Sequence, residues 1–403
     1  MSRHDGLSQW TSTVSTALPH LTRPQAAVLA LWSYGIVLAQ CCGLTTVAAL
    51  LAGVQGEREN SVRERLREWY RDAGDKRGDQ RRELAVASCF APLLRWVLAW
   101  WPPGERQMVL ALDASSLGAR FVVLAVSVVY RGCAVPVAWA ILPAARPGAW
   151  RPHWERLLAA LADAVPADWT VLVQADRGLY ARWLFLAIQA RGWHPFLRIN
   201  LGGQVRPGGA GGFIPLRALA PAVGSAWRGR VTCFASRDCQ LDCTLLARWD
   251  AGYADPWLIL TDLAPDQAEA VWYGLRGWIE QGFKDFKRGG WQWQRTRMTD
   301  PARVTRLWLA LAVATLWAVS VGGAADDALP ASTLDTLPAR HIARRRRRQR
   351  RPPRLLSAFR RGVLAILAAL LRGTPLPLGR FYPEPWPAPA APCPLPPELN
   401  LPL

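Results

Sequence analysis

The chain has 403 residues, of which 51% are hydrophobic and 20% charged, and its 49 Lys and Arg against 30 Asp and Glu give a formal net charge of +19. This length allows two or three domains with a large core, and the chain is too apolar to be a disordered protein. Eight scattered cysteines exclude a disulfide scaffold. The positive charge indicates an anionic partner, either nucleic acid or membrane headgroups.

Most of the excess charge lies in one stretch near the C-terminus. Residues 340–380 hold 13 Arg and no Asp or Glu, which leaves +6 for the rest of the chain. The densest run consists of Arg344, Arg345, Arg346, Arg347, Arg348, Arg350, Arg351 and Arg354. Such a run favours non-specific contact with the phosphate backbone, with a solvated linker or a membrane-surface segment as alternatives.

Residues 1–105 have the spacing of a helical region and form a candidate N-terminal DNA-binding domain. Within it, residues 61–84 are expected to form a charged helix that breaks near Gly74. Its arginines are a candidate DNA-contact surface, and a solvated helix with paired charges explains them equally well. Pro102 to Gly104 mark the end of this region.

Two long uncharged stretches, residues 25–55 and 307–325, pass a length test for a membrane-spanning helix. Both contain polar residues or glycines, and the buried helices of a soluble protein have the same composition. Met1 to His20 have no apolar core of the kind that a signal peptide needs. We therefore expect a cytoplasmic, nucleoid-associated protein that is not inserted in a membrane.

From residue 106 the pattern changes to an α/β fold, a mixed sheet flanked by helices. Its first part, residues 106–200, is expected to hold the strands 108–113, 120–130, 134–142, 169–175 and 194–199 and the helices 150–164 and 179–192. A glycine-rich, β-rich insertion follows at 201–256, with strands 228–236 and 240–248. The second part of the core, 257–325, contains a strand at 257–261 and helices at 265–287 and 301–321. Residues 326–403 are expected to be an Arg-rich and Pro-rich tail, because the last 29 residues hold 11 Pro.

Two of the apolar strands end in an acid, Asp113 and Asp176. A carboxylate in such a strand is costly to bury unless it is paired or binds a metal, and at the carboxyl edge of a sheet it faces the crevice where ligands bind. Either residue alone could equally be a turn or cap residue. Asp262 also follows a strand, but it precedes a Leu-Ala-Pro turn and is expected to be structural.

The expected helix 265–287 carries a polar stripe. At about 100° per residue its members fall within about 60° of one another, and they are Tyr273, Arg276, Glu280 and Lys287. Apolar residues elsewhere on the helix indicate that it is partly buried. The stripe is therefore expected to line a wet, anionic site, whereas Asp285 lies on another face.

The spacing Y-x2-R-x3-E-x6-K resembles the signature of cut-and-paste insertion-sequence transposases of the DDE class, the large bacterial family four. The segment YGLRGWIEQGFKDFKRG is similar to that family's region around the third acid. LALDASSL and VQADRGLYARWL resemble its first and second acid motifs. The resemblance spans about residues 105–325, and it departs from the family at Ala114, where Thr or Ser is frequent.

This resemblance implies a ribonuclease-H-like catalytic core with a β-strand insertion. It implies that Asp113, Asp176 and Glu280 are catalytic and hold two Mg²⁺ ions, for which Mn²⁺ can substitute. Oxygen ligands suit these ions, and no set of Cys and His in the sequence suits zinc.

The partners implied by the resemblance are double-stranded DNA, as element terminal inverted repeats and target DNA, and a second copy of the chain in a synaptic homodimer. The DNA-binding candidates are Tyr273, Arg276, Lys284, Lys287, Trp257, Arg344, Arg345 and Arg346. By resemblance Trp257 stands where an aromatic side chain receives a flipped base, and the alternative is that it is simply part of the core.

The leading hypothesis is therefore a DNA transposase that cuts at the element ends and joins the 3′ ends to target DNA. A catalytically inactive or domesticated DNA-binding relative is the second hypothesis, and a basic membrane protein is the third.

Overall fold

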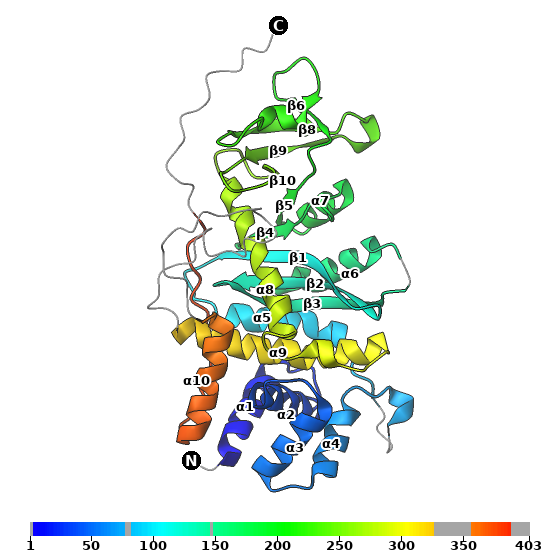
Figure 1. The fold of residues 1–403 in the computed structure, drawn as a ribbon, viewed down its shortest axis with the longest axis vertical. Helices are drawn as coiled ribbons and strands as arrows, with labels where there is room; N and C mark the ends of the chain where they lie inside the picture. The colour runs from blue at the N-terminus through cyan, green and yellow to red at the C-terminus, as the bar shows by residue number, and fades with distance from the viewer. Residues whose placement is uncertain (1–2, 77–81, 146–147, 326–355, 388–403) are drawn as a thin grey trace.

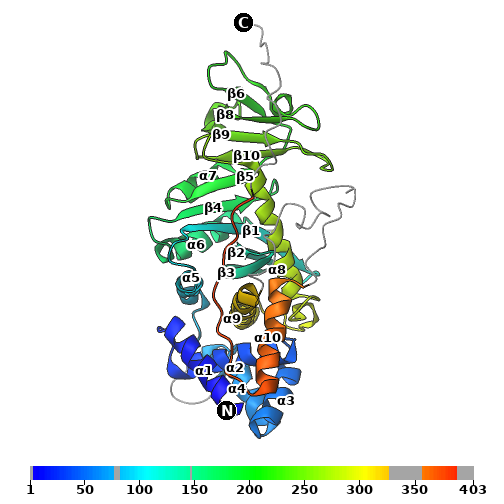
Figure 2. The same ribbon diagram turned by 90° about the vertical axis from the view of Figure 1, so that its left-hand side faces the viewer.

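The computed structural model describes residues 3–76, 82–145, 148–325 and 356–387. The molecule is elongated, with a group of N-terminal helices at one end and a single large sheet at the other (Figure 1). One long helix, α9 (Pro301–Ala325), lies between them, and the turned view shows it end-on between α5 and α10 (Figure 2).

Five helices form the N-terminal region: α1 (Arg3–Ala17), α2 (Arg23–Ala39), α3 (Leu44–Gln55), α4 (Glu59–Glu68) and α5 (Phe90–Ala99). The start of α2 is encoded locally. Thr22 and Gln25 form a reciprocal capping box, and a proline occupies the first turn of the helix. The helical character expected for this region is confirmed over the residues that the structure describes.

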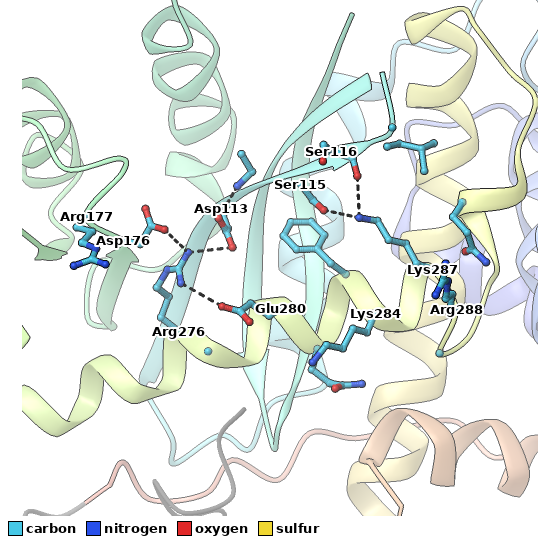
Figure 3. Close-up of a pocket in the computed structure, with 18 of the residues that line it drawn as sticks. Asp113, Ser115, Ser116, Asp176, Arg177, Arg276, Glu280, Lys284, Lys287 and Arg288 are labelled. Atoms are coloured by element: carbon cyan, nitrogen blue, oxygen red, sulfur yellow. Dashed lines mark hydrogen bonds and ion pairs between the residues drawn. The ribbon is translucent and has the colours of Figure 1, made fainter. Parts of the chain in front are cut away.

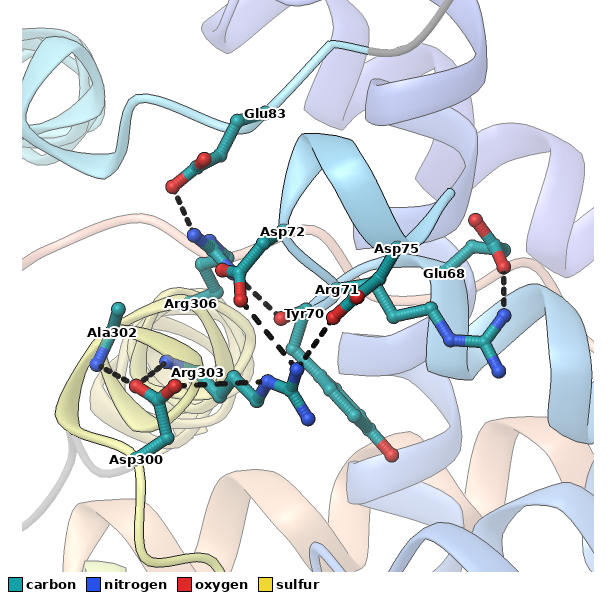
Figure 4. A network of polar contacts seen from close by, with 10 residues as sticks. All are labelled: Glu68, Tyr70, Arg71, Asp72, Asp75, Glu83, Asp300, Ala302, Arg303 and Arg306. Carbon is teal, nitrogen blue, oxygen red and sulfur yellow. Dashed lines mark hydrogen bonds and ion pairs between the residues drawn. The ribbon is translucent and has the colours of Figure 1, made fainter. Parts of the chain in front are cut away.

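The charged helix expected at 61–84 is wrong in its extent, because α4 ends at Glu68 and, among the described residues of the stretch, only a 3₁₀ turn (Ala73–Asp75) follows. Two arginines at the start of α9 contact the segment that follows α4. Arg306 donates hydrogen bonds to the Tyr70 carbonyl oxygen and to Asp72 Oδ1, and Arg303 pairs with Asp75 at 2.7 Å (Figure 4). The charged loop therefore joins the N-terminal helices to the central helix.

Two arginines of α4 and one in the turn after it are paired with acids, and Arg63 of α4 bonds the Asn60 side chain. Arg65 lies 2.7 Å from Glu57, Arg67 lies 2.6 Å from Glu64, and Arg71 bonds Glu68. These pairs are those of a solvated, charge-paired helix. DNA contact by this surface stays a prediction.

The sheet has ten strands in the order β3-β2-β1-β4-β5-β10-β9-β8-β6-β7. An antiparallel meander of β1 (Gln107–Leu117), β2 (Phe121–Tyr130) and β3 (Cys133–Pro143) comes first. β4 (Thr170–Ala175) then pairs in parallel with β1, and β5 (His194–Arg198) pairs in parallel with β4. The crossover helices α6 (Arg151–Leu161) and α7 (Arg182–Gln189) lie on one face, and α8 crosses the other (Figure 2). The mixed α/β fold is confirmed, and it is consistent with a ribonuclease-H-like transposase core.

The expected insertion continues the same sheet. Its strands are β6 (Gln204–Pro207), β7 (Ile214–Pro215), β8 (Ala226–Cys233) and β9 (Leu241–Arg248). β10 (Trp257–Thr261) pairs antiparallel with both β9 and β5, so the inserted strands extend the edge of the core. In Figure 1 they form the end of the molecule farthest from the N-terminal helices.

The segment expected as one helix over 265–287 is divided. A 3₁₀ helix, η6 (Ala270–Gly277), precedes the α-helix α8 (Trp278–Phe286), and Lys287 lies just beyond its end. Gly274 and Gly277 lower the helical propensity of the first part. All but one of the η6 residues are buried, so tertiary packing fixes the backbone there. The four polar residues therefore do not lie on one continuous α-helix, and the prediction of a single α-helical stripe is wrong.

The apolar helix expected at 301–321 is α9, and it runs on to Ala325. Asp300 caps its start by accepting a hydrogen bond from the Ala302 N–H. Among the described residues, α9 alone is long and apolar enough to cross a membrane, and α2 with α3 qualify only as a pair bent by 95°. The most apolar 18-residue stretch of α9 is 94% buried inside the protein, as in the core helix of a globular domain.

The described residues 356–387 are more ordered than the tail expected from the sequence. α10 (Ala358–Arg372) packs against α9, with Gly322 and Gly362 at the crossing. Residues 374–387 have no helix or strand, yet Leu376 and Phe381 are buried among the N-terminal helices and the sheet. The run Arg344, Arg345 and Arg346 lies outside the described residues.

Candidate active site

Asp113 and Asp176 are neighbours because of the register between two parallel strands. The last pair in the β1–β4 ladder is Leu112 with Ala175, so each acid is the next residue on its strand. Asp176 follows the end of β4. The sequence had indicated that Asp113 ends its strand, and this is wrong. β1 continues to Leu117, paired with β2. The acids thus lie where β1 and β4 separate, at the carboxyl edge of the parallel sheet.

Glu280 approaches the same place from the helix α8, which lies far from both aspartates in the sequence. Glu280 lies in the first turn of α8. Gly282 on the same helix allows α8 to pack closely on Ala134 of β3. Any side chain at position 282 would bring its Cβ to 2.9 Å from the Cβ of Ala134. The close approach of helix and sheet carries Glu280 toward the two aspartates (Figure 3).

A single guanidinium joins the three acids. Arg276 Nη2 lies 3.0 Å from Asp113 Oδ2 and 3.2 Å from Asp176 Oδ2, and Arg276 Nη1 lies 3.8 Å from Glu280 Oε1. Arg276 is only 8% exposed. Burial disfavours its charge, but Tyr273 and the three carboxylates outweigh burial and raise the pKa of Arg276. The arginine therefore stays charged at the centre of the acids.

These residues form the floor of an open cavity of about 1100 Å³. Cationic side chains lie around it, namely Arg177, Arg198, Lys284, Lys287 and Arg288. Lys287 Nζ donates hydrogen bonds to Ser115 Oγ at 2.8 Å and to the Ser116 carbonyl oxygen at 3.0 Å. Burial lowers the pKa of Lys287. An acidic floor beneath basic walls suits a polyanion whose backbone approaches a cation-binding centre.

A family model described as the transposase DDE domain matches residues 144–317. The chain carries a transposase DDE domain. The matched span includes Asp176 and Glu280 and begins after Asp113. A comparison with the curated proteins gives no match. The domain implies an enzyme that acts on DNA in transposition, and DDE transposases typically use divalent metal ions.

The three carboxylates Asp113, Asp176 and Glu280 fit such ions by their chemistry. Three carboxylates converge on one cationic group, and Mg²⁺ and Mn²⁺ prefer carboxylate oxygens. Within the described ranges, however, no group of three or more His, Cys, Asp or Glu side chains is arranged closely enough to hold a metal. The guanidinium of Arg276 lies between the three carboxylates.

Seven of the sequence candidates line this one cavity: Asp113, Asp176, Glu280, Tyr273, Arg276, Lys284 and Lys287. Trp257 is not among the lining residues. It is buried in β10 against the ring of Tyr273, with the two ring centroids 5.2 Å apart. Its proposed contact with a flipped base stays a prediction. Arg344, Arg345 and Arg346 fall outside the described part of the chain.

Sequence reasoning missed Arg198 of the DDE domain. This arginine ends β5, next to β4 in the sheet, and its guanidinium carbon lies 5.9 Å from the centre of the Tyr273 ring. Burial lowers the pKa of Arg198. The available signal was the same as for the acids, a charged residue at the end of an apolar strand. Arg177 and Arg288 were also missed, although each directly follows a residue that was singled out.

Proposed function

We propose that this chain is the cut-and-paste transposase of an insertion sequence of the family-four type. It cuts DNA at the element ends and joins the 3′ ends to target DNA. One observation carries the proposal: acids from β1, β4 and α8 meet on one guanidinium at the floor of a cavity with basic walls.

In this proposal Asp113, Asp176 and Glu280 hold two Mg²⁺ ions, for which Mn²⁺ can substitute. Such ions would supply the activation of an attacking oxygen and the stabilisation of the leaving 3′-oxygen for an in-line displacement at phosphorus. The rest is positioning by the protein. The β1–β4 register fixes the two aspartates, and the packing of α8 on β3 fixes Glu280.

The basic residues of the cavity hold the DNA backbone in this proposal. Lys284, Lys287 and Arg288 lie together on one side and Arg177 beside Asp176 on the other (Figure 3), and Arg198 follows Leu197, the strand partner of Ala175. A phosphodiester that follows these cations passes over the acids. The N-terminal helices of residues 1–105 are proposed to bind the terminal inverted repeats, and two copies of the chain to bring both element ends together.

Isosteric variants test the proposal. Asp113→Asn, Asp176→Asn and Glu280→Gln each remove one metal-binding charge and keep the side-chain shape. With Mg²⁺ and duplex DNA carrying the element's own ends, we expect each to lower strand cleavage by about 100-fold or more and to leave end binding within a few-fold of wild type.

Asp250→Asn is the matched control. Asp250 pairs with Arg248 at 2.8 Å in the inserted part of the sheet and does not line the cavity. Cleavage by this variant should equal that of the wild type. Retained cleavage in any of the three site variants contradicts the proposal, and end binding by the wild type without cleavage at any metal concentration identifies an inactive relative.

A further inference from the structure

Arg276 lies at the position that a cation shared by Asp113 and Asp176 takes. One nitrogen, Nη2, contacts one oxygen of each aspartate, at 3.0 and 3.2 Å. The other terminal nitrogen faces Glu280. Oxygen ligands lie about 2.0–2.1 Å from Mg²⁺, so the same carboxylates cannot enclose an ion while the guanidinium stands between them.

We propose that Arg276 competes with the divalent ions for the three carboxylates, and that metal loading is coupled to its release. This inference rests on the proposed function, since it takes the three acids as the metal ligands. Arg276 then acts as a built-in counter-ion that sets the metal affinity of the site.

The charges explain why such a counter-ion is useful. Three carboxylates brought together by folding repel one another, and their contacts with a single guanidinium offset part of that cost. Arg276 is nine-tenths buried, and its charge is balanced by the carboxylates around it. A displaced Arg276 therefore needs another anion close by.

DNA supplies that anion. The cavity that Arg276 lines is open, and a phosphate held by the basic residues of its walls comes within reach of the guanidinium. Arginine binds phosphate and carboxylate with the same planar geometry. Exchange of carboxylates for a phosphate frees the acids for metal, so DNA and metal are expected to bind cooperatively, each raising the affinity for the other.

Mn²⁺ binding to the full chain, measured by calorimetry or by the electron paramagnetic resonance of free Mn²⁺, tests the inference without any catalytic readout. Without DNA, we expect Arg276→Gln to bind Mn²⁺ about tenfold or more tightly than the wild type, because a competing positive charge is gone. Addition of duplex DNA should tighten Mn²⁺ binding to the wild type by a similar factor and leave Arg276→Gln nearly unchanged.

Arg248→Gln is the matched control, because it removes an arginine from an ion pair with Asp250 outside the site. Its Mn²⁺ affinity should equal that of the wild type. Arg276→Lys keeps the charge but not the forked contact, so its affinity should lie between those of wild type and Arg276→Gln, and it replaces the Gln variant if that variant does not fold.

The outcomes separate the inference from the proposed function. The inference is overturned if Arg276→Gln binds Mn²⁺ with the same affinity as the wild type. The same holds for Arg276→Lys where it replaces the Gln variant. Weaker binding by the arginine variant also overturns it. If Glu280→Gln leaves Mn²⁺ affinity unchanged, the acids are not the metal ligands and the proposed function fails instead.

Discussion

Lys287 Nζ lies 2.8 Å from Ser115 Oγ, which joins the end of α8 to β1 across 172 residues of sequence. The same two elements carry Glu280 and Asp113, which meet at Arg276. The first and third acids are therefore held together at two places. The second place, at Lys287, faces the cavity and leaves the ammonium close to any backbone phosphate there.

Lys287→Gln is expected to weaken DNA binding more than it weakens the fold. Lys287 is half-buried, and its loss removes one cation from the proposed phosphate path. We expect binding to fall about tenfold at moderate salt, and the slope of log affinity against log salt concentration to fall by about one. Titration of labelled duplex DNA at several salt concentrations measures both.

The control for this prediction is Ser115→Ala, which removes the hydrogen-bond partner and keeps the charge. Its salt slope should match that of the wild type. An unchanged slope for Lys287→Gln would show that Lys287 only ties the helix to the strand.

Asp285 is expected to make stability fall as pH rises. It is 2% exposed and accepts a hydrogen bond from Gln281, but burial raises its pKa from 3.8 to about 7. Because the folded pKa exceeds the unfolded one, the folded state binds the proton more tightly. The stabilisation is complete below about pH 4 and is lost as pH rises toward 7.

Asp285→Asn stays neutral and therefore escapes this loss. Relative to the wild type it should gain on the order of 2–3 kcal/mol in unfolding free energy between pH 5 and pH 8. Urea unfolding at the two pH values measures the difference. The same difference between variant and wild type at both values would show that Asp285 does not titrate in this range.

Much of the sheet could be predicted from sequence because each strand carries its own local signal. The Val-rich run at 121–130 and the buried run at 257–261 lie within a residue of their expected bounds. The presence of acids after two such runs predicted the site. What sequence could not give is the register between β1 and β4, which makes the two aspartates neighbours, because register depends on pairing between distant segments.

The segment around Glu280 shows the limit of periodicity. A uniform 100° step placed Tyr273, Arg276, Glu280 and Lys287 on one stripe, and all four do line the cavity. They reach it from a 3₁₀ helix, an α-helix and the residue after it. Packing around the buried residues of η6 determines its 3₁₀ backbone conformation. The local sequence pattern does not predict that packing. The contacts of Arg276 with the three acids could not be predicted either, because the sequence analysis expected its guanidinium to bind a DNA phosphate.

Composition misled most at the C-terminus. Proline excludes helix and strand from residues 375–387, as expected, but it does not prevent docking. Phe381 packs between Trp101 and Tyr130, and its N–H donates to the Trp100 carbonyl oxygen at 2.8 Å. Trp386 then packs against Trp272 of η6. This segment therefore spans from the N-terminal helices to the helix that carries Arg276.

Phe381→Ala is expected to destabilise the protein by about 3–5 kcal/mol, as for other buried aromatic residues. The ring is fully buried and lies 4.9 Å from that of Tyr130. Leu378→Ala is the control in the same segment, because Leu378 is 44% exposed and should cost about 1 kcal/mol or less. Urea unfolding of both variants gives the comparison, and equal costs would mean that the segment is not docked.

The crossing of α9 and α10 depends on two glycines, and it gives the last prediction. A Cβ at position 362 would lie 1.7 Å from the Ala318 carbonyl oxygen, and one at position 322 would lie 1.6 Å from that of Ala358. These contacts are with backbone, which cannot move aside without separating the helices. Gly362→Ala should therefore cost about 3 kcal/mol or more.

Gly53→Ala, in α3, is the matched control: its Cβ would meet nothing within 4 Å, and the better helix propensity of alanine should stabilise the protein by about 0.5–1 kcal/mol. Opposite signs for the two variants in urea unfolding confirm the close crossing, and a stabilising Gly362→Ala contradicts it.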